Sequence, residues 1–190
     1  MSLEEWAALP EDEPGEIVDG FLVEDEVSDP VHDVIAAWLV ASLRAWVRPR
    51  GGLVGVSDTK FAVSARRGRK PDTWVYFSRE KLPPRHGLVR VPPDLLAEVV
   101  SPRPRDQRRD RVEKLAEYAA FGVRYYWIVD PQLRTLEVLE LGADGRYVHA
   151  LAGSTGRIES VPGCPGLALD LDELWAEVDA FGPPEPDAEG

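Results

Sequence analysis

Residues 95–100 read LLAEVV, and this stretch decides the fold that the sequence predicts. Apolar side chains surround one glutamate, a composition typical of a strand buried on both faces of a sheet. Upstream, the β-branched and aromatic run Thr73–Phe77 predicts a second strand, and Arg124–Val129 predicts a third downstream. We expect a helix from about Asp106 to Phe121 to join the last two. This order predicts an α/β fold, a mixed sheet with helices on its faces.

Capping and turn residues mark the outer elements. Ser2 and Glu5 form a capping box, Asp19-Gly20 is typical of a hairpin turn, and Asp29-Pro30 begins a long helix. We expect residues 1–180 to form a single domain and residues 181–190, rich in proline and acidic side chains, to be a disordered tail. The outer elements expected are helices at 2–8, from 30 and at 171–178, strands at 53–56 and 61–63, an N-terminal hairpin at 16–23 and a C-terminal hairpin at 136–141 and 146–151.

The charge of −12 is distributed unevenly along the 190 residues. Residues 1–43 hold 12 acids and no Lys or Arg, residues 44–114 hold 18 basic side chains against 8 acids, and residues 115–190 hold 4 against 14. The basic middle could face a polyanion such as DNA, because phosphate binding requires Lys and Arg. The alternative is that the acidic ends fold against the basic middle and neutralise it.

Other compositional features narrow the class of protein. No stretch is long and apolar enough to span a membrane, and the N-terminus is acidic where a secretory signal is basic. The one cysteine, Cys164, cannot form an internal disulfide. We therefore expect a cytoplasmic protein with no membrane partner.

Two acids suggest a metal site. Glu98 interrupts the apolar strand, where a carboxylate is costly unless it is paired or bound to a metal. Asp72 opens the preceding strand, and carboxylates on neighbouring strands suit Mg²⁺ or Mn²⁺. The alternative is that Glu98 is a buried acid paired with an arginine such as Arg124.

Lys114 is the third candidate, since lysine is rare here, with 4 lysines against 18 arginines. On the predicted helix it lies beside an expected inner stripe formed by Val112, Leu115, Ala116 and Ala119. Its ammonium could neutralise charge that develops on a phosphate. The alternative is a solvated lysine paired with Asp110 one helical turn earlier.

Four blocks, GEIVDGFLVE, KPDTWVYFSRE, DLLAEVVSP and EKLAEYAAFGVRYYWIVDP, resemble in order and spacing the Uma-two family, whose members are described as restriction endonucleases of the PD-(D/E)XK superfamily. The resemblance covers about residues 16–171. It implies a restriction-endonuclease-like core, Mg²⁺ or Mn²⁺ as cofactor and DNA as partner. The residues carried over are the metal-binding acids Asp72 and Glu98, the catalytic Lys114 and, at the edge of the site, Glu16, His32 and Asp58.

One position departs from the superfamily pattern, because the lysine expected two residues after the acid is replaced by Val100. Activity then depends on Lys114, with Lys70 or Lys60 as substitutes. In the resulting hypothesis Asp72, Glu98 and the Val99 carbonyl hold the metal ion, which polarises the scissile phosphate and activates a water. DNA-backbone contacts are expected from the loop 66–70 and the run 103–111, through Arg66, Arg67, Arg69, Arg105 and Arg108.

Two other classes of function stay open. A catalytically inactive module on the same fold is favoured by the lost lysine position and by the acidic net charge. An interaction protein without a nucleic-acid role is the second, and a homodimer is also left open. Convergence of Asp72, Glu98 and Lys114 in one cleft would favour the nuclease.

Overall fold

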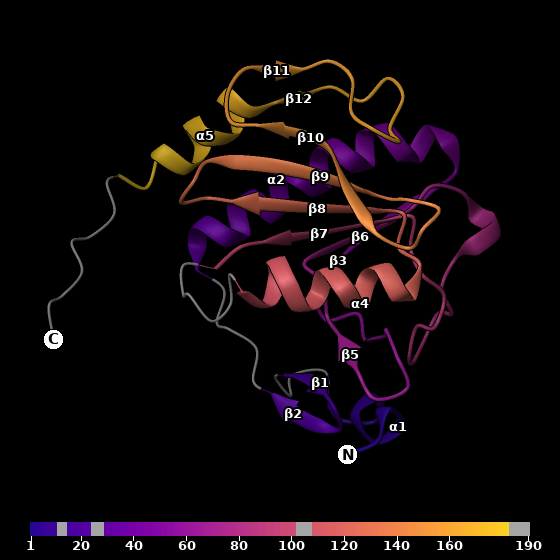
Figure 1. Cartoon of the computed structure of the whole chain (residues 1–190). Coiled ribbons are helices and arrows are strands. Elements are labelled where there is room, and N and C mark those ends of the chain that lie inside the picture. Colours follow the sequence, from indigo (N-terminus) through magenta and orange to yellow (C-terminus); the bar gives the residue numbers. More distant parts are fainter. Residues whose placement is uncertain (11–14, 24–28, 102–107, 183–190) are drawn as a thin grey trace, which may run out of the picture.

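The computed structural model describes residues 1–10, 15–23, 29–101 and 108–182. Arg105 and residues 183–190 of the predicted tail lie outside these ranges. The largest element is a six-stranded sheet with the strand order β10-β9-β8-β7-β6-β3 (Figure 1). Only the β7–β8 pair is parallel within it. Its strands are β3 (Leu53–Val56), β6 (Thr73–Tyr76), β7 (Leu95–Val99), β8 (Tyr125–Asp130), β9 (Thr135–Leu141) and β10 (Tyr147–Gly153).

Strand β7 is central and buried along its whole length, as the run LLAEVV predicts. Its side chains alternate between two apolar clusters because successive residues of a strand point to opposite faces. Leu95, Ala97 and Val99 pack in one cluster, with the helices α2 (Pro30–Val47) and α5 (Leu171–Asp179). Leu96 packs in the other, with α4 (Lys114–Phe121). Glu98 has the same parity as Leu96, so it faces α4.

The long helix α2 begins where its sequence predicts. The Asp29 side chain accepts a hydrogen bond from the His32 amide at 2.8 Å, and Pro30 occupies the first turn. A 3-10 turn, η1 (Arg48–Arg50), then leads to Gly51, which ends the segment with a left-handed φ of 84°. Figure 1 shows α2 crossing one face of the sheet while α4 covers the other.

The N-terminal part forms a second, four-stranded sheet with the order β2-β1-β5-β4. Asp19 and Gly20 both have positive φ, 53° and 89°, and make the predicted hairpin turn. The stretch 66–70, expected to be a loop, contains a short strand, β5, because it pairs with both β1 and β4. The elements of this part are α1 (Leu3–Ala7), β1 (Glu16–Val18), β2 (Phe21–Val23), β4 (Phe61–Ala62) and β5 (Gly68–Arg69).

The C-terminal elements close the face of the sheet that α2 covers. Strands β11 (Arg157–Ile158) and β12 (Leu169–Asp170) pair with each other and lead into α5. Trp175 of α5 is buried and donates its indole hydrogen bond to the Ser154 carbonyl at 2.8 Å. Among the described residues, no helix is long and apolar enough to cross a membrane.

Candidate active site

The two predicted acids meet at one end of the central sheet. The β6–β7 register pairs Thr73 with Ala97, which places Asp72 and Glu98 at the next position along the same two strands. Asp72 Oδ2 accepts a hydrogen bond from the Val99 amide at 2.7 Å, which anchors the carboxylate to β7. The strand pairing therefore brings together residues that are 26 positions apart in the sequence.

His32 joins these acids from the first turn of α2. Its Nε2 lies 3.1 Å from Asp72 Oδ2. Burial alone would lower the pKa of His32, but the hydrogen bond to Asp72 and the neighbouring carboxylates outweigh it and raise that pKa to about 9. Burial would likewise raise the pKa of Asp72, but His32 and Lys114 hold it below its ordinary value. His32 and Asp72 therefore form an ion pair at neutral pH.

Glu98 is almost fully buried and is held by two donors from the helical segment on its face of the sheet. The Lys114 ammonium lies 3.1 Å from its Oε2, and the Tyr118 hydroxyl donates to its Oε1 at 2.6 Å. Burial raises the pKa of Glu98 to about 8, because the negative charges of nearby acids oppose the lowering effect of Lys114. The predicted alternative partner, Arg124, is exposed and pairs with Glu140 instead.

Lys114 lies where the catalytic hypothesis requires. Its side chain is 6% exposed, and its Nζ is 3.0 Å from Asp110 Oδ1 as well as close to Glu98. The pairing with Asp110 is therefore present, but the alternative of a solvated lysine is wrong, because Lys114 is buried and also reaches Glu98. Burial opposes the charged form, but the surrounding carboxylates raise its pKa well above the ordinary value, so it stays an ammonium.

The predicted inner stripe of this helix is wrong at two of its four positions, although Leu115 does pack against the apolar cluster on this face. Val112 is 57% exposed and Ala116 is also exposed, whereas Asp110, Lys114 and Tyr118 are buried. The cause is local: residues Arg109–Glu113 form a π-helical turn, η3, in which the Lys114 amide bonds to the Arg109 carbonyl five residues back. Asp110, Lys114 and Tyr118 therefore form the buried face of this segment, which the apolar pattern had assigned to valine and alanine.

Glu16 belongs to a second buried group beside the site. It accepts hydrogen bonds from the Arg69 guanidinium at 2.6 Å and from the Lys70 amide at 2.8 Å. Arg69 also binds both carboxylate oxygens of Glu117, at 2.6 and 2.8 Å. Burial opposes the charge of Arg69, but the bonds to Glu117 and the charge of Glu16 raise its pKa. This group ties β1 and β5 to α4.

The structure corrects the predicted DNA contact through Arg69. Its side chain is 0% exposed and makes three hydrogen bonds, to Glu16 and Glu117, so it is absent from the surface that a DNA backbone would touch. Arg67 is also engaged internally, since it pairs with Asp19 and Glu117. Arg66 and Arg108 are exposed, as backbone contacts would have to be.

The remaining predicted residues are the edge residue Asp58 and the two substitute lysines, Lys60 and Lys70. Asp58 is 73% exposed and has the Lys70 ammonium 3.6 Å away. Lys60 donates to the carbonyls of Trp6 and Leu9, at 2.8 and 3.2 Å, and so supports α1. The substitution of Lys60 for Lys114 is therefore wrong for this fold.

Tyr118 and Glu117 are the contacts that sequence reasoning missed. The signal available for Tyr118 was its spacing, because it follows Lys114 by one helical turn in the same EKLAEY run. No comparable signal marked Glu117, whose partners Arg67 and Arg69 lie about fifty residues away. Asp110 was considered only as a competing partner of Lys114, yet it is part of the same buried group.

The described residues contain no cluster of three or more His, Cys, Asp or Glu side chains arranged to hold one metal ion. Asp72 and Glu98 alone fit a different pattern, because Mg²⁺ is usually held by one or two carboxylates plus water and substrate phosphates. Burial raises the pKa of Glu98, and the negative charges of neighbouring acids add to this effect, so a cation bound beside the acids would favour the ionised carboxylate. The donor set thus suits a hard divalent ion.

Comparisons with known proteins agree with this fold. The model of the Uma2 family, described as "Putative restriction endonuclease", matches residues 2–172. The crystal structure of a protein from Anabaena variabilis, described as "a putative nuclease belonging to DUF820", superposes with a TM-score of 0.73. It covers 94% of this chain and 99% of that chain at 18% identity, and such a likeness shows the fold alone. The predicted restriction-endonuclease-like fold is confirmed. No curated protein matches the chain.

Proposed function

Because the chain belongs to the Uma2 family, we propose that it is a metal-dependent endonuclease that hydrolyses phosphodiester bonds in DNA. The observation that carries the proposal is the buried Lys114 ammonium, 3.1 Å from Glu98 at the strand end that Asp72 shares. A fixed cation beside two acids suits phosphoryl chemistry, in which the protein mainly positions groups and stabilises charge. The family description supports the choice of DNA as substrate.

Asp72 and Glu98, with the Val99 carbonyl, would hold the Mg²⁺ or Mn²⁺ ion. When bound, such an ion polarises a phosphoryl oxygen and makes a water molecule more acidic. The Val99 amide and His32 already fix the direction of one Asp72 oxygen. Tyr118 fixes Glu98 in the same way, since its hydroxyl keeps its proton and donates it to Oε1.

Lys114 supplies charge rather than a proton in this proposal. Its pKa is raised by four surrounding carboxylates, so the ammonium persists throughout the neutral range. A phosphate entering beside Glu98 would meet this cation without the cost of ordering it, because the side chain is already buried and paired. The same position could not be occupied equivalently by the planar guanidinium of arginine.

The test compares cleavage of plasmid and linear DNA by the wild type, Glu98→Gln and a matched control, Glu159→Gln, with Mg²⁺ or Mn²⁺. Glu159 is 71% exposed on its side chain, so its change removes the same charge outside the site. We expect metal-dependent cleavage by the wild type and the control, and none by Glu98→Gln with an unchanged circular dichroism spectrum. Equal cleavage by all three proteins would exclude the assigned site, and an inactive wild type would exclude the nuclease.

A second candidate is a module of this fold that binds DNA without cutting it. It is favoured by the occupation of both Glu98 oxygens, one by Lys114 and one by Tyr118. Each contact takes up one lone pair of a Glu98 oxygen, so a metal ion would have to share both oxygens with these donors. Binding of a DNA duplex by the wild type, with no cleavage in either metal, would support this candidate.

A further inference from the structure

Exposed basic side chains gather at the end of the sheet that lies opposite the candidate active site. Residues 44–50 and 79–81 contain five basic side chains and one acid, Glu80, in a chain with a net charge of −12. We call these basic side chains the arginine surface: Arg44, Arg48, Arg50, Arg79 and Lys81. We propose that the arginine surface binds the phosphate backbone of duplex DNA at a place distinct from the active site. The choice of DNA as partner rests on the proposed function.

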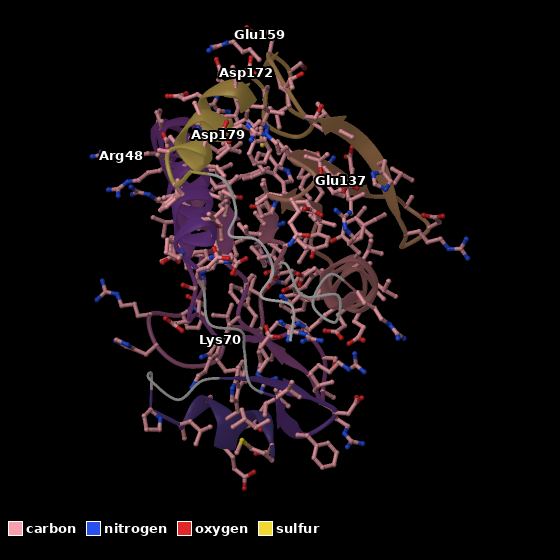
Figure 2. All side chains as sticks on the ribbon, turned by 90° about the vertical axis from the view of Figure 1, so that its left-hand side faces the viewer. Arg48, Lys70, Glu137, Glu159, Asp172 and Asp179 are labelled. Carbon is pink, nitrogen blue, oxygen red and sulfur yellow. The ribbon has the colours of Figure 1, made fainter. Side chains whose placement is uncertain are left out.

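The first observation is that these arginines lack acidic partners. Arg44, Arg48 and Arg79 are exposed, and their side chains make no ion pair or hydrogen bond with any part of the chain that the structure describes. Among the described residues, Arg50 donates to the carbonyls of Trp46 and Pro165, and its guanidinium lies over the Trp46 ring, 4.7 Å from the centroid. Their positive charge is therefore available to a ligand, and Figure 2 shows Arg48 at the margin of the molecule.

The arginines nearer the active site differ in this respect. Arg67 pairs with Asp19 and Glu117, and Arg69 with Glu16 and Glu117. Arg111 pairs with Asp130 at 3.0 Å and also with Glu137. Three arginines of the segment whose excess positive charge suggested DNA binding thus pair with acids of the protein itself, and the arginine surface contributes five of the other fifteen basic side chains.

The geometry of the arginine surface suits a phosphate backbone. Arg44 lies in the last turn of α2 and Arg48 is its helical C-cap, whose amide bonds to the Arg44 carbonyl, so their Cβ atoms lie about 5–6 Å apart on one face. Arg79 comes from another 3-10 turn, η2 (Arg79–Lys81), and its side chain lies against Gly51, where an added Cβ would be 3.9 Å from Arg79 Cγ. A guanidinium can bind a phosphate through two parallel N–H groups.

The arginine surface is too far from the acids to be part of the same phosphate site. Helix α2 carries His32 near its first residue and ends beside Arg48. Sixteen residues of α-helix span about 24 Å. Strand β6 shows the same separation, because Asp72 precedes its start and Arg79 follows its end. One DNA segment held here would leave the active site free for another segment, or for a distant part of the same duplex.

A purely structural role explains only part of the arginine surface. Arg44 and Arg48 lie in and after the last turn of α2, where cations offset the partial negative charge of the helix end. Arg79 and Lys81 are not on that helix, and Lys81, 64% exposed, has only the long 3.8 Å contact with Asp94. The helix dipole therefore does not account for the gathering of charge from two separate elements.

The experiment measures binding of a short fluorescent DNA duplex by anisotropy, in Ca²⁺ and over a range of salt. The variant Arg48→Gln/Arg79→Gln is compared with Arg90→Gln/Arg157→Gln. The control pair removes the same charge from exposed arginines, 57% and 56% exposed on their side chains, that pair with Glu4 and Glu159. The slope of log affinity against log salt is negative, and each lost phosphate contact reduces its magnitude by about 0.9. We expect Arg48→Gln/Arg79→Gln to reduce the magnitude of the slope by about 1.8 and the control variant to leave the slope unchanged.

Equal slopes for the two variants would overturn the proposal that the arginine surface binds DNA. A wild type that binds no duplex at low salt would overturn it as well. Binding of polyglutamate by the wild type, without any binding of DNA, would assign the surface to an acidic protein and would also overturn the proposal. Cleavage is scored separately in Mg²⁺. If the wild type is inactive but the slope changes as expected, DNA binding by the arginine surface is supported and the nuclease function is rejected. If the wild type is active but the slopes are equal, the nuclease function is supported and DNA binding by the arginine surface is rejected.

Discussion

Replacement of Arg69 by methionine should destabilise the protein strongly. The change removes a side chain that is 0% exposed and donates to Glu16 at 2.6 Å and to Glu117 at 2.6 and 2.8 Å. Both glutamates would stay buried with fewer compensating charges. Removing one partner of a buried ion pair typically lowers the free energy of unfolding by about 3–5 kcal/mol, because the other charge is left unpaired. This is a large part of the roughly 5–15 kcal/mol that stabilises most domains.

Urea unfolding, followed by tryptophan fluorescence, measures the loss. With a slope of about 2 kcal/mol per M, the midpoint should fall by about 2 M. The control is Arg66→Met, which changes an exposed arginine three residues earlier that donates to the Asp19 carbonyl; it should change the free energy of unfolding by no more than about 0.5 kcal/mol. If Arg69→Met does not fold, Arg69→Lys keeps the charge, loses the bidentate contact with Glu117 and gives the same test at smaller amplitude.

The reasoning is refuted if Arg69→Met unfolds at the same urea concentration as Arg66→Met and loses DNA binding. That pair of results would mean that Arg69 contacts phosphate, as the sequence alone suggested. The ion-pair explanation also predicts coupling: adding Glu117→Gln to Arg69→Met should lower the free energy of unfolding by less than it does in the wild type, because the partner is already gone.

Four further predictions follow, three from the candidate active site and one from the buried cysteine. Millimolar-range Mg²⁺ or Mn²⁺ should raise the melting temperature of the wild type but not of Asp72→Ala, since an ion bound only to the folded state stabilises it. Lys114→Ala should abolish cleavage and keep the metal-induced shift, and Lys114→Arg should restore little activity. Tyr118→Phe removes the bond to Glu98 Oε1, so kcat should fall while KM for DNA stays constant, as kinetics would show. Burial raises the pKa of Cys164 to about 12, so iodoacetamide should modify it at pH 8 only after urea unfolding; this group destabilises the fold as pH rises from about 9 to 12, because the unfolded thiol ionises first.

The fold was predictable where local signals and burial agree. The run LLAEVV is a central strand because its apolar side chains serve both faces of the sheet, in the clusters on the α2 and the α4 side. The Asp19-Gly20 turn and the Asp29-Pro30 helix start depend on backbone preferences of single residues, which tertiary structure did not override. The convergence of Asp72, Glu98 and Lys114 followed from strand order and from the helix returning across the sheet.

The helix after β7 shows where such prediction stops. Apolar periodicity placed Val112 and Ala116 inside, although both are exposed. A π-helical turn has no clear signature in the sequence, and it changes which residues share a face. The buried face is instead set by pairing across space, since Asp110 and Lys114 satisfy each other and Glu98. Such partners are decided by the fold and cannot be read from spacing along one element.

The charge pattern makes the same point for the whole chain. A basic middle between acidic ends was compatible with DNA binding and with internal neutralisation. Internal neutralisation applies to Arg67, Arg69 and Arg111, because each pairs with acids from other segments of the chain. Arg48 and Arg79 lie on the surface and have no such partner among the residues that the structure describes. The two alternatives are therefore not exclusive, and burial sorts the arginines between them: those that face the sheet hold the fold together, and only those on the surface can meet a phosphate.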